Sequence, residues 1–155
     1  MVFKNEKQLE DFLMKKCQSA LLKAQEKVYV IIKKFLDQFY SEYDPHENGK
    51  YGYDRTYQFL NSLVKSQIVP SGKGYKAEVY FNLNYIYENY IYESGSNPSG
   101  EQVMQAADWG RHGAMGLAVA DFKGTSVWHE SLAELDAKAI NILVDMLRAE
   151  GIPIK

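Results

Sequence analysis

The chain has 155 residues, of which 46% are hydrophobic and 25% are charged, and its formal net charge is −2. This composition is typical of a folded domain and excludes a largely disordered chain, and the near-neutral charge argues against a surface given over to nucleic acid or anionic lipid. We expect a single domain over residues 1–155. Cys17 is the only cysteine, so no internal disulfide can form. The sequence contains neither a signal-peptide pattern nor a long apolar run, so we expect no membrane contact.

The first expected element is a long helix over residues 5–40, a stretch without Pro or Gly. From Cys17 onward its apolar residues recur mostly at steps of three and four, which is the period of one helical face, and Asn5 can cap its start. Such a helix would be about 50 Å long, whereas a compact domain of this size is roughly 40 Å across. We therefore expect either a break near Ser19 or packing of part of the helix on another subunit.

The polar side of this helix is basic, with four lysines close to one face: Lys16, Lys23, Lys27 and Lys34. A solvated face is the simplest interpretation, and contact with an anion or with DNA phosphates is the alternative. The lysines lack interleaved aromatic residues, so we expect no sequence-specific nucleic-acid binding.

Residues 54–93 combine a short helix, a β-hairpin and a Tyr-rich segment. The hairpin is indicated by the alternation of Tyr75, Ala77 and Val79 with polar residues, and by a turn containing Pro and Gly. Nine of the twelve tyrosines fall between residues 51 and 92, where they either fill the edges of the core or contact other subunits. The expected bounds are 55–62 for the helix, 63–69 and 75–83 for the strands, 70–74 for the turn and 85–92 for a final helical turn.

Residues 94–116 are expected to be a flexible Gly-rich loop that includes a short helix over 101–109, and a third strand is expected over 117–122. The last helix covers residues 127–150 and carries five acids against two bases, opposite in sign to the first helix, so the two helices are expected to pack together within or between subunits. The predicted fold is therefore α+β, with a long N-terminal helix, a small antiparallel sheet built on the hairpin, and the C-terminal helix packed on the sheet.

Patterns of enzyme chemistry are weak. The histidines at 46, 112 and 129 lie in separate segments, and His129-Glu130 lacks the second histidine of a zinc-protease motif. Cys17 falls in the apolar stripe of the first helix, where a nucleophile is not expected. Asp108 with His112 or His129 is the remaining acid–base combination, and it defines the alternative of a small cytosolic hydrolase. We expect no catalytic residue, no metal and no cofactor.

Two short stretches, RTYQFLNSL from Arg55 to Leu63 and YENYIYESG from Tyr87 to Gly95, together with the segment 128–152, carry a family resemblance. In their order they resemble the small head–tail connector and tail-completion proteins (minor tail component family) of long-tailed bacteriophages and prophages. The stretch from Ala106 to Gly113 departs from that pattern, because the family commonly has a proline–aromatic sequence there.

The resemblance implies a structural protein that is not an enzyme: a ring subunit, often sixfold, that joins the tail tube to the head connector. The implied partners are further copies of the chain and neighbouring neck, connector or tail-tube proteins. The implied location is the neck or tail of the virion, and the host cytoplasm before assembly. A helix-mediated cytosolic binding module is a further alternative. The expected turn anchors are Arg55 and Tyr57, and the expected interface residues are Lys16, Lys23, Lys27, Lys34, Trp109, Arg111 and His112.

Overall fold

The computed structural model describes residues 3–42, 57–86, 99–110 and 124–154, and it confirms the α+β class. The expected third strand over 117–122 and the residues Arg55, Arg111 and His112 lie outside this part of the chain. The elements in chain order are α1 (Glu6–Ser41), α3 (Gln58–Ser62), β1 (Leu63–Lys65), β2 (Val69–Ser71), β3 (Gly74–Lys76), β4 (Val79–Phe81), the 3-10 helix η1 (Leu83–Tyr85), α4 (Gly100–Asp108) and α5 (Val127–Ala149).

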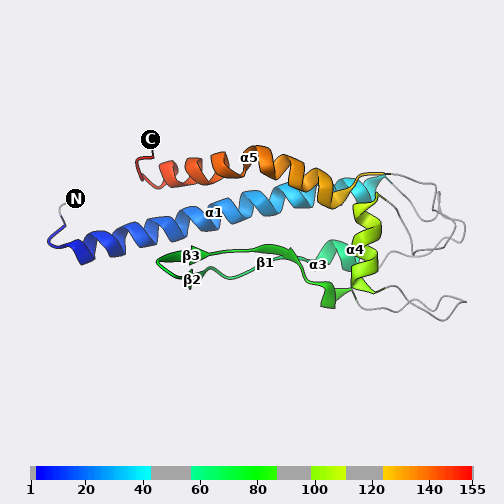
Figure 1. Cartoon of the computed structure of the whole chain (residues 1–155), viewed down its shortest axis with the longest axis horizontal. Coiled ribbons are helices and arrows are strands. Elements are labelled where there is room, and N and C mark those ends of the chain that lie inside the picture. Colours follow the sequence, from blue (N-terminus) through cyan, green and yellow to red (C-terminus); the bar gives the residue numbers. More distant parts are fainter. Residues whose placement is uncertain (1–2, 43–56, 87–98, 111–123, 155) are drawn as a thin grey trace, which may run out of the picture.

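Helix α1 is one continuous helix of 36 residues, and it does not break near Ser19. The predicted cap is confirmed, because the side-chain oxygen of Asn5 accepts a hydrogen bond from the backbone N–H of Gln8 at 2.9 Å. At 1.5 Å per residue the helix is about 54 Å long. It therefore forms the axis on which the other elements are placed (Figure 1).

Helix α5 packs on α1 and runs antiparallel to it, with α1 between α5 and the hairpin (Figure 1). Thr125, just before α5, donates its backbone N–H to Glu42 at one end, and Glu150, just after α5, pairs with Lys16 at the other. The expectation that the C-terminal helix packs on the sheet was therefore wrong. A two-stranded ribbon is narrow, and its helix-facing side is already occupied by α1. The expectation that the two oppositely charged helices pack together is confirmed, within one chain.

The hairpin is confirmed, but it is interrupted. Strands β1 and β4 pair with Leu63 opposite Phe81, and β2 and β3 pair with Ser71 opposite Gly74. Between the two ladders, residues 66–68 face residues 77–78, which is three against two and constitutes a β-bulge. The loop is shorter than expected: Gly72 and Lys73 form it, and Gly72 has a positive φ of 58°.

The main core lies around the C-terminal half of α1, where the helices and the hairpin converge. Aromatic rings from three elements meet there, with Phe59 stacked on Phe81 at 5.0 Å and set edge-on to Phe39 at 6.2 Å. Helix α4 runs across this end of the molecule and begins with a capping box formed by Ser99 and Gln102 (Figure 1). The buried cluster consists of Ile32, Leu36, Phe39, Phe59, Leu63, Ile86, Ala107 and Val127.

The first turns of α1 project beyond the other elements that the structure describes. Helix α5 ends where Glu150 reaches Lys16, and the hairpin tip also stops short of the N-terminus (Figure 1). Leu9 and Leu13 on the projecting turns remain 39% and 40% exposed. The molecule is therefore a rod with a well-packed end and a bare helical end.

Candidate functional site

Three of the four lysines proposed as interface residues are held by α5 within the chain. The carboxylate of Glu150 receives Lys23 Nζ at 2.5 Å, Ser19 Oγ at 2.7 Å and Lys16 Nζ at 3.2 Å. Hydrogen bonds from Lys23, Ser19 and Lys16 lower the pKa of Glu150 to about 2. This charged clamp fixes the C-terminal end of α5 to the middle of α1.

A second ion pair links the two helices nearer the core. Lys34 Nζ lies 2.7 Å from Glu134, which also accepts a hydrogen bond from Lys138 at 2.7 Å. Hydrogen bonds from Lys138, which has the larger effect, and from Lys34 lower the pKa of the Glu134 carboxyl group. Lys27 makes no ion pair with the residues that the structure describes, and its side chain is exposed.

The well-packed end is tied together by hydrogen bonds from the start of α5. Glu42, the C-cap of α1, accepts the backbone N–H of Thr125 at 2.6 Å and its hydroxyl at 2.5 Å. The backbone N–H of Gly124 donates to the carbonyl of Gly110 at 2.7 Å, so the chain positions just before residue 111 and just after residue 123 lie together. Trp109, the expected interface aromatic, is the C-cap of α4 beside this contact and is 44% exposed.

Tyr57, one of the two expected turn anchors, is in a strained conformation. Its φ is +54°, in the left-handed region that a bulky side chain rarely adopts. Its ring stacks on Tyr40 with 5.6 Å between centroids, and the Tyr40 hydroxyl accepts a hydrogen bond from the backbone N–H of Leu60 at 3.3 Å. These contacts hold the start of α3 against the end of α1, and the anchoring role itself stays a prediction.

The expected acid–base residues Asp108 and His129 do meet. His129 Nδ1 lies 2.9 Å from Asp108 Oδ1, and Ser126 Oγ donates to the backbone carbonyl of Asp108 at 2.5 Å. The Ser126 hydroxyl is thus directed at a carbonyl, and the His129 side chain is 76% exposed. A nucleophile needs a hydrogen bond to its base in a shielded site. The contact between Asp108 and His129 therefore links the end of α4 to the start of α5.

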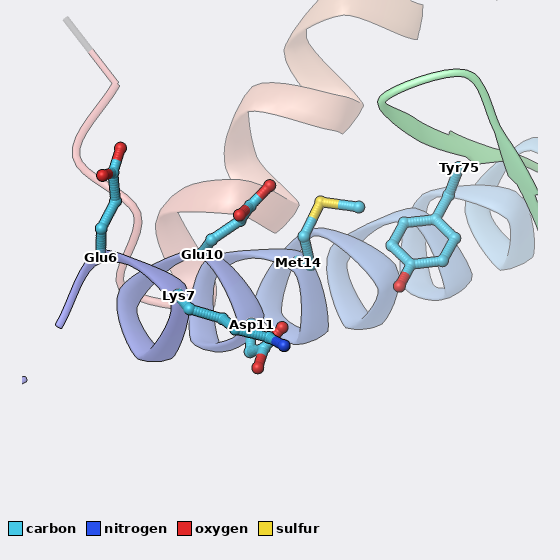
Figure 2. Close-up of a pocket in the computed structure, with 6 residues that line it drawn as sticks. All are labelled: Glu6, Lys7, Glu10, Asp11, Met14 and Tyr75. Atoms are coloured by element: carbon cyan, nitrogen blue, oxygen red, sulfur yellow. The ribbon is translucent and has the colours of Figure 1, made fainter.

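A shallow depression lies on the projecting end of α1. Tyr75 from β3 reaches over the helix beside Met14, and Glu6, Lys7, Glu10 and Asp11 line the remainder (Figure 2). The depression is open and mixed in charge. No group of three or more His, Cys, Asp or Glu residues suited to a metal ion occurs in the described ranges. Among the described helices, none is both long and apolar enough to cross a membrane.

Sequence reasoning missed two polar residues that organise the rod. Gln25 is 5% exposed and lies under the hairpin, and Glu150 is the acceptor of the charged clamp. A glutamine among the apolar positions of α1 was a signal for the first. The opposite charges of the two helices indicate that they attract each other, but a charge total does not identify Glu150, among the five acids of the last helix, as the residue that binds the lysines.

Comparison with known proteins gives a family match. A family model described as YomN matches residues 5–150, which run from the cap of α1 to the Glu150 clamp. No curated protein and no solved structure matches the chain. By its name the family is derived from Bacillus phages and prophages, so the match indicates a phage-associated protein. The chain belongs to the YomN family.

Proposed function

We propose that this phage-associated protein is a structural subunit of a phage or prophage neck or tail, which joins or completes the tail at the head connector through ring-type self-association. In this proposal it is not an enzyme. Its partners are further copies of itself and neighbouring neck, connector or tail-tube proteins. It resides in the virion, and in the host cytoplasm before assembly.

The observation that carries the proposal is the uncovered start of α1. Leu9 and Leu13 lie on the same side of the helix as Lys16, Ala20 and Lys23, at steps of four and three. Farther along, this side is covered by α5, and Ala20 is fully buried. The apolar stripe therefore continues past the end of its cover. A neighbouring subunit that continues the cover would give the head-to-tail contact from which rings are built.

The internal ion pairs modify the expected interface. Lys16, Lys23 and Lys34 are engaged with Glu150 and Glu134, so a contact through them would have to displace bonds that already exist. Lys27 and Trp109 are more accessible candidates. We therefore propose the projecting turns of α1 as the main subunit contact. Of the expected interface residues, Lys27 and Trp109 are the two that add to this contact.

The experiment is a measurement of assembly by mass in solution and by negative-stain imaging, for the protein alone and mixed with tail and connector components. The test variant is Leu9→Gln/Leu13→Gln, which keeps helix propensity but removes the exposed apolar side chains. The control is Asp11→Asn/Lys15→Gln on exposed positions of the same turns, which leaves the net charge unchanged. We expect rings or capped tails with the control and none with the test variant. A wild-type protein that neither forms rings nor binds tail components would refute the proposal.

A further inference from the structure

The outward side of α5 carries a row of apolar residues that we call the α5 seam: Ala133, Ala137, Ile140, Val144 and Leu147. Successive members are four, three, four and three residues apart. This is the 3.5-residue repeat by which helices pair in coiled coils. The repeat is separate from the residues that hold α5 on α1, so α5 has two apolar faces and only one of them has a partner in the described structure.

The seam is turned away from α1. At 3.6 residues per turn its members fall on the far side of the helix from Val127, Ser131 and Leu135, which are directed at the core. Ile140 at the centre is 78% exposed, Ala133 and Ala137 are exposed, and Val144 and Leu147 are half-buried, whereas Ser131 on the opposite side is fully buried. A single exposed isoleucine is ordinary, but a heptad row centred on one marks an interaction surface.

The seam is complementary to itself when reversed. Its first half carries only methyl side chains, at Ala133 and Ala137, and its second half carries the larger Val144 and Leu147. An antiparallel copy places the large half of each helix on the small half of the other, with Ile140 at the two-fold axis. A parallel copy would place alanine on alanine at one end and crowd large residues at the other.

The charges beside the seam favour the same orientation. Glu130 near its start is exposed, and Arg148 near its end is 55% exposed with only a 3.8 Å contact to Asp145 as an ion pair among the described residues. The two lie 18 residues apart, which is five full turns, so they share one side of the helix. Antiparallel pairing brings each arginine toward the glutamate of the other copy, whereas parallel pairing leaves the arginines and the glutamates at opposite ends of the helix pair.

From these features we propose that the α5 seam is a dimer contact, at which two copies of this chain pair antiparallel about a two-fold axis at Ile140. One helix pair is small beside specific interfaces, which bury about 1,200–2,000 Å² in total. We therefore expect a micromolar dimer. The contact is independent of the proposed role in the tail, because it uses α5 whereas the ring contact uses the projecting turns of α1.

Disulfide trapping tests the geometry. In a Cys17→Ser background, Ile140→Cys should give a covalent dimer on mild oxidation, because residue 140 meets itself at the axis. A mixture of the Ala133→Cys and Leu147→Cys proteins should cross-link to each other at least about tenfold more than either does alone. Leu22→Cys is the control, since Leu22 is 57% exposed on α1, outside the seam. Equal cross-linking of the control would overturn the proposal.

Sedimentation equilibrium over a range of protein concentrations tests the energetics. Wild-type protein should form dimers, and Ile140→Glu should weaken them by at least about tenfold, because a carboxylate at the axis would face its own copy. The thermal midpoint measured at a concentration where both proteins are monomeric should be unchanged, since the side chain is exposed. A dimer that survives Ile140→Glu, or a wild-type protein that stays monomeric at high micromolar concentration, would refute the contact. Loss of ring formation in Leu9→Gln/Leu13→Gln would leave this result unaffected.

Discussion

The side-chain amide of Gln25 donates a hydrogen bond to the backbone carbonyl of Ser66 at 2.9 Å, under the bulge of the hairpin. The same nitrogen donates at 2.9 Å to the carbonyl of Glu78 on the opposite strand. An amide nitrogen carries two hydrogens, so one buried side chain of α1 satisfies both strands where their own pairing is interrupted. Helix and ribbon are joined at this point.

Replacing Gln25 by Met should destabilise the fold by about 1–3 kcal/mol, because two carbonyls lose their donor while the volume is kept. Urea unfolding would measure the loss. Gln18→Met is the control, since Gln18 is exposed on the same helix. Equal stability of Gln25→Met and the wild type would show that the bulge does not depend on this amide.

Replacing Glu150 by Gln should destabilise the fold in a pH-dependent way. The pKa of Glu150 falls from an ordinary 4.5 to about 2 on folding, so the ionised carboxylate stabilises the folded state above pH 4.5. This contribution is lost as the pH falls through the folded pKa. The difference in thermal midpoint between wild type and variant should therefore be largest near pH 6 and should decrease as the pH falls from 4.5 to 2.

Asp145→Asn serves as the control for that profile, because its carboxylate is exposed and only 3.8 Å from Arg148. A difference between Glu150→Gln and the wild type that stays constant from pH 6 to pH 2 would contradict the clamp.

Two glycines with similar backbone angles should respond very differently to alanine. Gly72 has a φ of +58° and open space where a Cβ would stand, so Gly72→Ala should cost only the conformational penalty of about 1–2 kcal/mol. At Gly110, with a φ of +65°, a Cβ would overlap the carbonyl group of Gly124. Gly110→Ala should therefore cost clearly more in urea unfolding, and equal costs would show that the contact between Gly110 and Gly124 yields easily.

The contact between Asp108 and His129 should contribute little to the stability of the fold. The histidine is 76% exposed, so His129→Ala should lower the free energy of unfolding by less than about 1 kcal/mol and leave assembly unchanged. Thermal unfolding and the assembly measurement check this together. If His129→Ala kept its fold but removed a catalysed turnover, the hydrolase alternative would be supported.

The helices could be predicted because their signals are local. The Asn5 cap and the apolar stripe of α1 each depend on residues within a few positions of one another, so the sequence alone indicates them. The positions of the strands were predicted less well. Alternation extends over residues 75–83, but the bulge shifts the register by one residue, and the side chain that bonds to both strands there, Gln25, is distant in the chain.

The packing partner of α5 could not be predicted from its stripe. An apolar stripe reports that a face is buried, but it does not identify what covers it. The sheet was the expected partner, whereas the hairpin is a two-stranded ribbon, paired in two ladders, that already packs on α1. Of the four lysines in the expected interface, three already form ion pairs with Glu150 and Glu134, which the sequence pattern did not indicate.

The hydrogen bond between Gly124 and Gly110 has a practical consequence for imaging. Gly110 and Gly124 lie side by side, so both ends of a graft joined at these two residues would start from a single point. A small fluorescent or gold-binding tag placed between residues 110 and 124 would therefore need no spanning linker. With such a tag, electron micrographs could locate the well-packed end of each subunit within an assembled particle.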